Sequence, residues 1–497
     1  MSGVERGPDG IAGYSDLHPS LVHLLRASLE RAPEKTALVE VGADSLTYQE
    51  LWDRSAAVAG GLRESGIERG DRVAIRMANG VDWVLAFFGA QLAGAVVVPV
   101  NTRFTEDEVA YVVEDSGSKM TFEAGTPLPQ GALLVEEQLG PDDLAAIFYT
   151  SGTTGFPKGA MTSHGNFTTN AENCLRVQRV NRSEGPDLAT LIQVPLFHVT
   201  GCNSQLIPLL QLGARVVMLS NPLDIDGFFT AVNELGVTHM VSVPAIYHAV
   251  IRQPRFAELD LSRVRSVIYG GAPISENLVR EIEHAFPKAN LGNGFGLTET
   301  SSLATCLPGE DAVAHADSVG FAVPVVDLAI DEPDPESGVG ELLIRGANVV
   351  QGYWNKPRET AETFVDGWLH TGDLGRIDED GLLYVVDRKK DMINRGGENV
   401  YSLEVENVIA EVPGVAEVSV LAVPDDMMGE KVGAVVVPLP GTHIDTDTVI
   451  AYCKSHMADF KVPQYLFVRE APLPRNPNGK VLKRELREET AWGAPLR

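Results

Sequence analysis

The stretch from Tyr149 to Gly159 concentrates residue types that bind phosphate. It follows an apolar run and holds four serine or threonine hydroxyls, three glycines and one lysine within eleven residues. Glycines allow consecutive backbone N–H groups to turn toward an anion, and the hydroxyls and the lysine add hydrogen-bond donors and positive charge. Pro157 stands where a Walker A loop has glycine, which excludes that motif. The predicted polyphosphate loop comprises Thr150, Ser151, Gly152, Thr153, Thr154, Gly155 and Lys158.

Other segments have the chemistry of a nucleotide site. Thr298 and Glu299 combine a hydroxyl with a hard carboxylate, which suits a phosphate oxygen and a Mg2+ ion that retains its waters. Asp373 follows a Thr-Gly turn, where a carboxylate can accept both hydrogen bonds of a ribose diol. Gly271-Ala272-Pro273 and Gly294-Phe295-Gly296 place small residues beside an aromatic ring, so that a flat base can lie against the backbone.

Two more residues are candidates whose type alone does not decide their role. His198 lies between an apolar run and Val199-Thr200-Gly201, where a core histidine is the commoner interpretation. Lys480 follows the turn-forming stretch 475–479, which could carry a long side chain into the cleft of another domain. A solvated surface lysine is the alternative at that position.

The composition excludes several functional classes. The 497 residues are 44% hydrophobic and 22% charged, with a mean hydropathy of -0.01, which is typical of a globular protein with more than one domain. Lys and Arg number 40 against 68 Asp and Glu, so the net charge of -28 repels nucleic acid. We therefore expect no nucleic-acid partner.

Cysteine usage and hydropathy predict a cytoplasmic enzyme. The four cysteines form no C-x-x-C or Cys/His cluster, so their pattern indicates neither a disulfide framework nor a zinc site. The N-terminal ten residues lack the apolar run of a signal peptide. The longest apolar stretch, Trp83 to Val100, is interrupted by Gln91, two glycines and Pro99, so we predict a buried helix and strand and no integral membrane segment.

The elements that must position these residues alternate between helix and strand up to about residue 330. Thr47 and Glu50 form a capping box at the start of a helix. The valine-rich runs Asp71 to Met77 and Ala95 to Val100 are typical of strands that are covered on both faces. This alternation predicts an α/β fold with a largely parallel, helix-covered sheet, whose strand ends bind ligands.

Beyond Gly340 the pattern changes. The segment from Glu341 to Asn399 is rich in turns and charge, and we interpret Asp387 to Asp391 as a solvated linker. A compact α+β unit of about 100 residues follows, a size that can fold independently. Its predicted helices lie near 403–411 and 446–456, and its predicted strands near 417–423, 431–437 and 464–468.

Taken together, these segments resemble the adenylate-forming superfamily that contains acyl-CoA synthetases, nonribosomal peptide adenylation domains and firefly luciferase. The matching motifs occur in the same order and extend over nearly the whole chain. They are Tyr149–Gly159, Pro195–His198, Tyr269–Pro273, Gly294–Thr300, Gly340–Leu342, Gly352–Trp354, Trp368–Asp373, Asp387–Asp391 and Asn478–Lys480.

The resemblance implies a domain organisation and a reaction. A large N-terminal domain of helix-covered, mostly parallel sheets with a small β-rich subdomain would span 1–387, followed by a hinge at 388–390 and a smaller mobile α+β domain over 391–497. A carboxylate would attack the α-phosphate of ATP with Mg2+ as cofactor, and coenzyme A (CoA) would then take the acyl group from the acyl-adenylate. The implied enzyme is an ATP-dependent acid–thiol ligase.

The resemblance also implies roles for particular residues. Lys480 would neutralise charge between the carboxylate and the α-phosphate, Glu299 would hold the metal beside Thr298, and Arg388 would assist Asp373 at the ribose. The implied nucleotide site adds Gly271, Ala272, Pro273, Gly294, Phe295 and Gly296 to the phosphate loop. The implied acyl pocket comprises His198, Thr200, Gly296, Ser302 and Leu303, with His198 positioning the substrate. Lys390 would be the hinge residue, and Gly396 and Gly397 would border the CoA tunnel.

Several alternatives stay open. Small or mixed residues around the pocket disfavour acetate, which leaves medium- or long-chain fatty acids and aryl or alicyclic acids. An amino-acid adenylation domain usually has an aspartate near His198 and a joined carrier domain, whereas 17 residues follow Lys480 here, so we expect a stand-alone ligase. The presence of Lys158, Glu299, Asp373 and Lys480 disfavours a catalytically silent nucleotide-binding protein. A carrier-protein thiol as acceptor and a homodimer as assembly remain alternatives.

Overall fold

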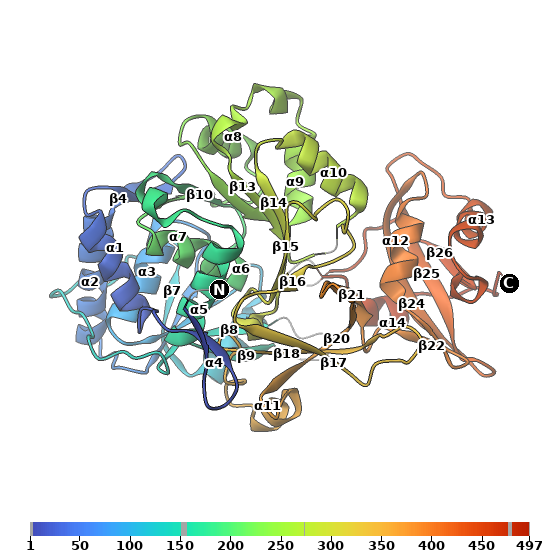
Figure 1. The fold of residues 1–497 in the computed structure, drawn as a ribbon, viewed down its shortest axis with the longest axis horizontal. Coiled ribbons are helices and arrows are strands. Elements are labelled where there is room, and N and C mark those ends of the chain that lie inside the picture. The colour runs from blue at the N-terminus through green and yellow to red at the C-terminus, as the bar shows by residue number, and fades with distance from the viewer. Residues whose placement is uncertain (1–2, 151–156, 273, 476–479, 497) are drawn as a thin grey trace. The chain divides into compact units, whose positions relative to one another are not determined.

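The computed structural model describes residues 3–150, 157–272, 274–475 and 480–496. These residues form two compact units (Figure 1). The first unit comprises Met1–Leu328, Ile344–Leu369 and Glu379–Leu383, and the second comprises Ala329–Leu343, His370–Asp378 and Tyr384–Arg497.

A largely parallel sheet forms the centre of the first unit. Within the described residues it has nine strands, which lie in the order β16 (Phe321–Ala322), β15 (Thr305–Pro308), β14 (Asn290–Phe295), β13 (Ser266–Gly270), β12 (His239–Ser242), β10 (Ala189–Ile192), β11 (Arg215–Met218), β3 (Thr36–Glu40) and β4 (Ser45–Thr47). The run from β14 to β3 is parallel, and the strands at both edges are antiparallel. This arrangement confirms the predicted α/β fold.

A second sheet of the first unit carries the predicted phosphate loop. Its strands lie in the order β7 (Ser118–Glu123), β5 (Arg72–Arg76), β6 (Val96–Pro99), β8 (Leu144–Thr150) and β9 (Lys158–Ser163). All neighbours are parallel except β8 and β9, which form an antiparallel hairpin. Strands β5 and β6 confirm the two predicted valine-rich strands.

Helices cover both sheets. They are α1 (Leu21–Arg31), α2 (Tyr48–Glu64), α3 (Val81–Leu92), α4 (Glu106–Ser116), α5 (His164–Val177), α6 (Val199–Gly201), α7 (Ile207–Gln211), α8 (Ile225–Asn233), α9 (Pro244–Ile251) and α10 (Glu276–Ala285). The predicted capping box is present at α2, where the Glu50 N–H donates to Thr47 Oγ1 over 3.1 Å and the Thr47 N–H donates to Glu50 Oε2 over 2.8 Å. Near the top of Figure 1, α9 and α10 lie beside β13 and β14, with which they share an apolar core.

Helix α3 is the apolar helix predicted within residues 83–100. Every residue of it except Asp82 is buried, and Trp83 stacks on Phe87 with ring centroids 5.3 Å apart. Its side chains belong to the largest apolar cluster of the first unit. None of the helices in the described parts of the chain is both long enough and apolar enough to span a bilayer.

The segment from 326 to 388 contains the five strands β17 to β21, although its sequence suggested turns. Its sheet has the order β17 (Val326–Asp331), β18 (Gly340–Gly346), β20 (Trp368–Ile377) and β19 (Phe364–Val365), and β21 (Leu383–Arg388) also pairs with β20. Helix α11 (Pro357–Thr363) precedes β19. An N-terminal hairpin of β1 (Val4–Arg6) and β2 (Ala12–Tyr14) lies in the first unit.

The C-terminal part of the second unit is the predicted α+β structure. Its sheet has the order β23 (Glu398–Val400), β22 (Ile393–Arg395), β25 (Gly429–Pro438) and β24 (Val415–Asp425), with β26 (Tyr465–Val468) parallel to β25. Helices α12 (Ser402–Ala410), α13 (Thr446–His456) and α14 (Lys483–Glu489) accompany it. Val405, Ile409, Val432 and Val449 are fully buried in one apolar core.

Candidate functional site

The β8–β9 hairpin determines where the predicted phosphate loop begins and ends. Thr150 is the last residue of β8 and pairs with Lys158, the first residue of β9. Ser151, Gly152, Thr153, Thr154 and Gly155 lie outside the described residues. Lys158 is half-buried. Its ammonium is thus held at the base of a seven-residue connection between two paired strands.

Glycines lie at the ends of two adjacent parallel strands. Gly270 in β13 pairs with Gly294 in β14, and a Cβ on Gly270 would lie 2.1 Å from the Gly294 carbonyl oxygen. Gly271 follows with a φ of +73°, a conformation that favours glycine. The structure thus brings together Gly271 and Ala272 with Gly294 and Phe295. Pro273 lies outside the described residues.

The predicted metal-binding pair lies on a short 3₁₀ turn, Thr298–Thr300. Both Thr298 and Glu299 are half-buried. The Val350 N–H donates to the Glu299 carbonyl over 2.9 Å, and the Asn348 side chain donates to the Thr300 carbonyl over 2.9 Å. These bonds anchor the backbone of the turn and leave the Glu299 side chain for other partners.

Tyr353 connects Glu299 with Lys158. Its hydroxyl donates to Glu299 Oε1 over 2.6 Å, and Lys158 Nζ lies 4.9 Å from the centroid of its ring. Burial raises the pKa of Tyr353, and the adjacent Glu299 carboxylate raises it further, so the phenol stays protonated and acts as the donor. The sequence motif Gly352–Trp354 included this tyrosine but gave it no role.

The Glu299 carboxylate has the chemistry that Mg2+ requires. It is a hard oxygen ligand, one of its oxygens accepts a hydrogen bond from a neutral donor, and no ion pair joins it to another described residue. A hydroxyl on Thr298 adjoins it in sequence. These groups fit a hydrated divalent cation.

Two of the residues predicted for the acyl pocket, Ser302 and Leu303, form hydrogen bonds with polar side chains of other elements, and we call this group the polar wall. Ser204 Oγ donates to Ser302 Oγ over 2.7 Å, and the Leu303 N–H donates to Asn170 Oδ1 over 2.9 Å. Ser204 lies on the π-helix Cys202–Leu206, which follows His198 and Thr200 on the chain. π-Helical turns are frequent at functional sites.

The backbone at this wall is tightly constrained. Ser302 has a φ of +116°, a conformation that is rare for residues with a side chain. A Cβ on Gly296 would lie 1.5 Å from the Ser302 carbonyl oxygen, so only glycine fits there. Gly296 and Ser302 are therefore direct neighbours, as a shared pocket wall requires.

In the second unit, Asp373 and Arg388 are paired. Arg388 Nε lies 2.5 Å from Asp373 Oδ1, and the Asp373 residue is 2% exposed. The Thr371 hydroxyl accepts from the Asp373 N–H over 3.0 Å, which fixes the backbone of the predicted turn. The structure thus brings together the two residues that were predicted to act at the ribose.

The interpretation of 387–391 as a solvated linker is wrong for Asp387. This residue is buried at the end of β21, and its carboxylate accepts hydrogen bonds from the N–H and, over 3.0 Å, the hydroxyl of Ser402. Lys483 Nζ donates to the same hydroxyl over 2.7 Å and lies 2.8 Å from Glu406 Oε1. Burial raises the pKa of both Asp387 and Glu406, while Lys483 opposes that shift. A local run of charges could not reveal these distant partners.

The other predicted residues of the second unit are exposed. Gly396 and Gly397 form the two-residue turn between β22 and β23, with φ values of +63° and +95°. Hairpin turns of this kind favour glycine at both positions, so the turn itself explains this pair. Lys390 and Lys480 are exposed.

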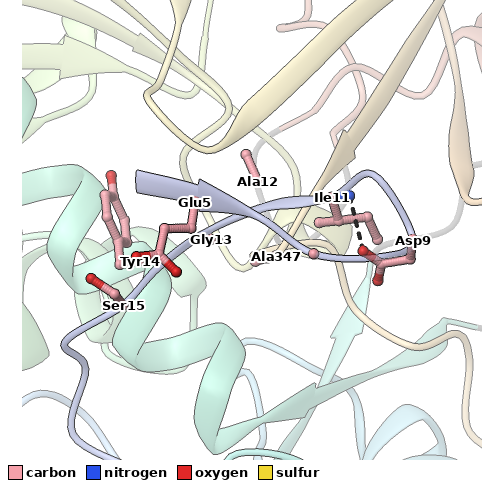
Figure 2. A pocket seen from close by; sticks show the side chains of 9 residues that line it. Glu5, Asp9, Ile11, Ala12, Gly13, Tyr14, Ser15 and Ala347 are labelled. Carbon is pink, nitrogen blue, oxygen red and sulfur yellow. Dashed lines mark hydrogen bonds between the residues drawn. The ribbon is translucent and has the colours of Figure 1, made fainter. Parts of the chain in front are cut away.

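A cavity of about 310 Å³ lies at the N-terminal hairpin (Figure 2). Its lining comprises Glu5, Gly7, Asp9, Ile11, Ala12, Gly13, Tyr14, Ser15 and Ala347. The Ile11 N–H donates to Asp9 Oδ1 over 3.0 Å, so the Asp9 carboxylate, one of the two that line the cavity, stabilises the turn of the hairpin. None of the predicted site residues in the described ranges lines this cavity.

Comparison with known proteins identifies the family. The sequence model of the "AMP-binding enzyme" family matches residues 25–135 and 123–354. The model of the "AMP-binding enzyme C-terminal domain" matches residues 404–480.

Curated relatives align over almost the full chain. A feruloyl-CoA synthase of Amycolatopsis sp is 36% identical over 481 residues, covering 92% of this chain and 96% of the relative. A long-chain-fatty-acid–CoA ligase of Mycobacterium tuberculosis is 35% identical over 507 residues, covering 95% of this chain and 99% of the relative. Among solved structures, O-succinylbenzoate coenzyme A synthetase of Bacillus subtilis in complex with ATP and magnesium ion is similar, with a TM-score of 0.85 and 28% sequence identity. The alignment covers 95% of this chain and 100% of that structure's chain.

Proposed function

The chain belongs to the AMP-binding enzyme family and is an AMP-forming acid–CoA ligase, and on this premise we propose that it activates a medium- or long-chain fatty acid or an aryl or alicyclic acid. The observation that carries the site assignment is the Lys158–Tyr353–Glu299 contact. It joins the base of the predicted phosphate loop to the predicted metal-binding turn within one compact unit. The contact therefore holds the Lys158 ammonium and the Glu299 carboxylate near one another, where they can bind the phosphates and the metal of MgATP.

The first half-reaction follows from the chemistry of these residues. Lys158 and the hydroxyls of the phosphate loop would bind the polyphosphate of ATP, and Glu299 with Thr298 would hold Mg2+. When bound, the metal neutralises phosphate charge as a Lewis acid. The substrate carboxylate attacks the α-phosphate, pyrophosphate leaves, and the mixed anhydride converts a poor acyl donor into a good one. Asp373 and Arg388 orient the ribose, with Gly271, Ala272 and Phe295 beside the base.

The second half-reaction transfers the acyl group to the CoA thiol and releases AMP. We assign Lys390 as the hinge of a mobile domain that presents Lys480 during adenylation. After the domain rotates, the turn at Gly396 and Gly397 borders the path of the pantetheine arm. Conformational steps of this kind exclude water and assemble each reaction in turn.

The polar wall narrows the choice of acid. Ser204 and Ser302 are bonded to each other, and each hydroxyl retains the capacity to accept another hydrogen bond. These hydroxyls favour an aryl acid that carries a hydroxyl or ether oxygen over an unsubstituted fatty acid. This preference agrees with the feruloyl-CoA synthase relative.

A panel of carboxylic acids tests this assignment. Pyrophosphate release and acyl-CoA formation are measured with hydroxylated aryl acids, unsubstituted aryl acids, alicyclic acids and fatty acids of graded length, each with and without CoA. The highest kcat/KM is expected for the hydroxylated aryl acids. Turnover confined to fatty acids contradicts the aryl preference. Pyrophosphate release without thioester formation points to a carrier-protein acceptor, and no release with any acid contradicts the catalytic assignment.

A further inference from the structure

Tyr353 occupies a backbone position that is fixed to β9. The Met161 N–H donates to the Gly352 carbonyl over 3.0 Å, the Trp354 N–H donates to the Gly159 carbonyl over 2.7 Å, and Tyr353 itself forms a bridge with Ala160. Strand β9 begins at Lys158. The tyrosine and the lysine are therefore carried by one hydrogen-bonded backbone frame.

The side chain of Tyr353 is equally constrained. It is buried, with 6% of its surface exposed, and its ring packs edge-on against Phe364 with centroids 5.6 Å apart. The Tyr353 N–H donates to Thr360 Oγ1 over 3.0 Å, which fixes the preceding turn. A buried phenol with so few accessible rotamers presents its hydroxyl at one place, and that place is the Glu299 carboxylate.

A neutral partner is physically different from an ion pair at this position. A phenol donates one short, charge-assisted hydrogen bond to a carboxylate oxygen and leaves the negative charge in place. The face of its ring attracts an ammonium without neutralising it. Direct pairing of Lys158 with Glu299 would cancel both charges, and no such ion pair occurs between these two residues.

We propose that Tyr353 is a positioning residue for MgATP, whose hydroxyl orients the Glu299 carboxylate toward the metal while its ring holds the Lys158 ammonium toward the phosphates. This inference rests on the proposed function, because it takes Glu299 as the metal ligand. Residues that orient a metal ligand through a hydrogen bond typically contribute 10–100-fold to metal affinity or activity. The two contacts of Tyr353 can be separated by mutation.

Tyr353→Phe removes the hydroxyl and keeps the ring that faces Lys158 and Phe364. Binding is measured by calorimetry with ATP in the presence of Mg2+ and with ATP in EDTA. We expect the affinity for MgATP to fall about 10-fold or more, while the affinity for metal-free ATP stays at the wild-type value. Tyr353→Leu also removes the ring, so we expect it to weaken metal-free ATP binding as well.

Tyr247→Phe is the matched control. It removes another buried phenol of the first unit, whose hydroxyl donates to the Ile268 carbonyl over 2.9 Å. We expect this variant to bind MgATP like the wild type. A Tyr353→Phe variant that melts at the wild-type temperature and retains wild-type affinity for MgATP overturns the proposal.

A double-mutant cycle keeps the proposal testable if Tyr353→Phe lowers stability. In the Glu299→Gln background the metal-dependent effect of Tyr353→Phe should disappear, because the tyrosine acts through that carboxylate. An equal effect in both backgrounds contradicts the proposal. Absence of acid-dependent pyrophosphate release by the wild type would contradict the proposed function instead, and the binding comparison would still decide the role of Tyr353.

Discussion

The two units of the molecule hold their charged side chains in different ways. In the first unit, Glu299 and Lys158 share the neutral partner Tyr353. In the second unit, the acidic residues near the predicted ribose site and hinge have cationic partners. These pairs are Asp373 with Arg388, Glu341 with Lys389, and Glu406 with Lys483. The comparison suggests that charges with a neutral partner are available for a ligand, whereas the pairs Glu341–Lys389 and Glu406–Lys483 chiefly fix the chain. Asp373 and Arg388 are the paired charges that we nevertheless place at the ribose.

The largest effect on rate is expected from replacing one of two lysines that lie three residues apart in the second unit. Lys480 is exposed, whereas Lys483 is partly buried against Glu406 and Ser402. We expect Lys480→Ala to reduce acid-dependent pyrophosphate release by on the order of 10²–10³, because it removes a preorganised positive charge from between two anions. Thioester formation from a supplied acyl-adenylate and CoA should persist, since the mobile domain has then turned.

Lys483→Ala is the matched control for this experiment. It should lower the melting temperature and leave both half-reactions of the remaining folded enzyme near the wild-type rate. Loss of both half-reactions in a well-folded Lys480→Ala variant would refute the rotating-domain mechanism. Wild-type rates in both assays would instead identify Lys480 as an ordinary surface lysine.

Glu299→Gln tests the first half of the comparison. The substitution keeps the shape of the side chain and removes its charge, so the rate of adenylation should fall by on the order of 10² and recover partly as Mg2+ is raised. The melting temperature should stay near the wild-type value, because no ion pair joins Glu299 to another described residue. Wild-type activity at limiting Mg2+ would exclude Glu299 as the metal ligand.

The sequence predicted the elements whose signals are local. The capping box at Thr47 and the helix at 446–456 follow from residue types a few positions apart, and both are present. Asp387 was misinterpreted because its charged neighbours are typical of a solvated segment. Its burial depends on Ser402, 15 residues away, and on Lys483, a further 81 residues along the chain. The role of Tyr353 was missed for the same reason, since Glu299 lies 54 residues before it.

Asp387→Ala tests the second half of the comparison. The substitution removes the acceptor of two Ser402 hydrogen bonds in a buried place, so we expect a loss of about 1–3 kcal/mol in the free energy of unfolding. This loss is measured by urea denaturation, monitored with a spectroscopic probe in the second unit. Glu276→Ala, which removes an exposed partner of Arg280, is the control and should change stability by less than about 1 kcal/mol. Equal stability of both variants would show that the buried network does not hold the chain.

The smallest effect is expected at an ion pair of the first unit. It tests whether a charged side chain that has a partner stabilises the fold, and takes no part in the reaction, in the first unit as well. Asp327 lies in the first unit, where its carboxylate binds Arg6 Nη2 over 2.6 Å and Arg345 Nη2 over 2.9 Å. The hydrogen bond from Arg6, aided by Arg345 and opposed by burial, lowers the pKa of Asp327 from 3.8 to about 2. Because Arg6 is 54% exposed, solvent screens these pairs and we expect them to contribute little to the free energy of unfolding.

The pH dependence of this contribution has a definite sign. A carboxylate whose pKa is lower in the folded state stabilises the fold above its unfolded pKa, and that stabilisation is lost as the pH falls through the folded pKa. Melting temperatures of Asp327→Asn and the wild type should therefore differ most above about pH 5 and converge between pH 3.8 and about 2. High salt should reduce the difference at neutral pH. Adenylation should stay at the wild-type rate, whereas a loss of activity without a loss of stability would show that a paired charge of the first unit also serves the reaction.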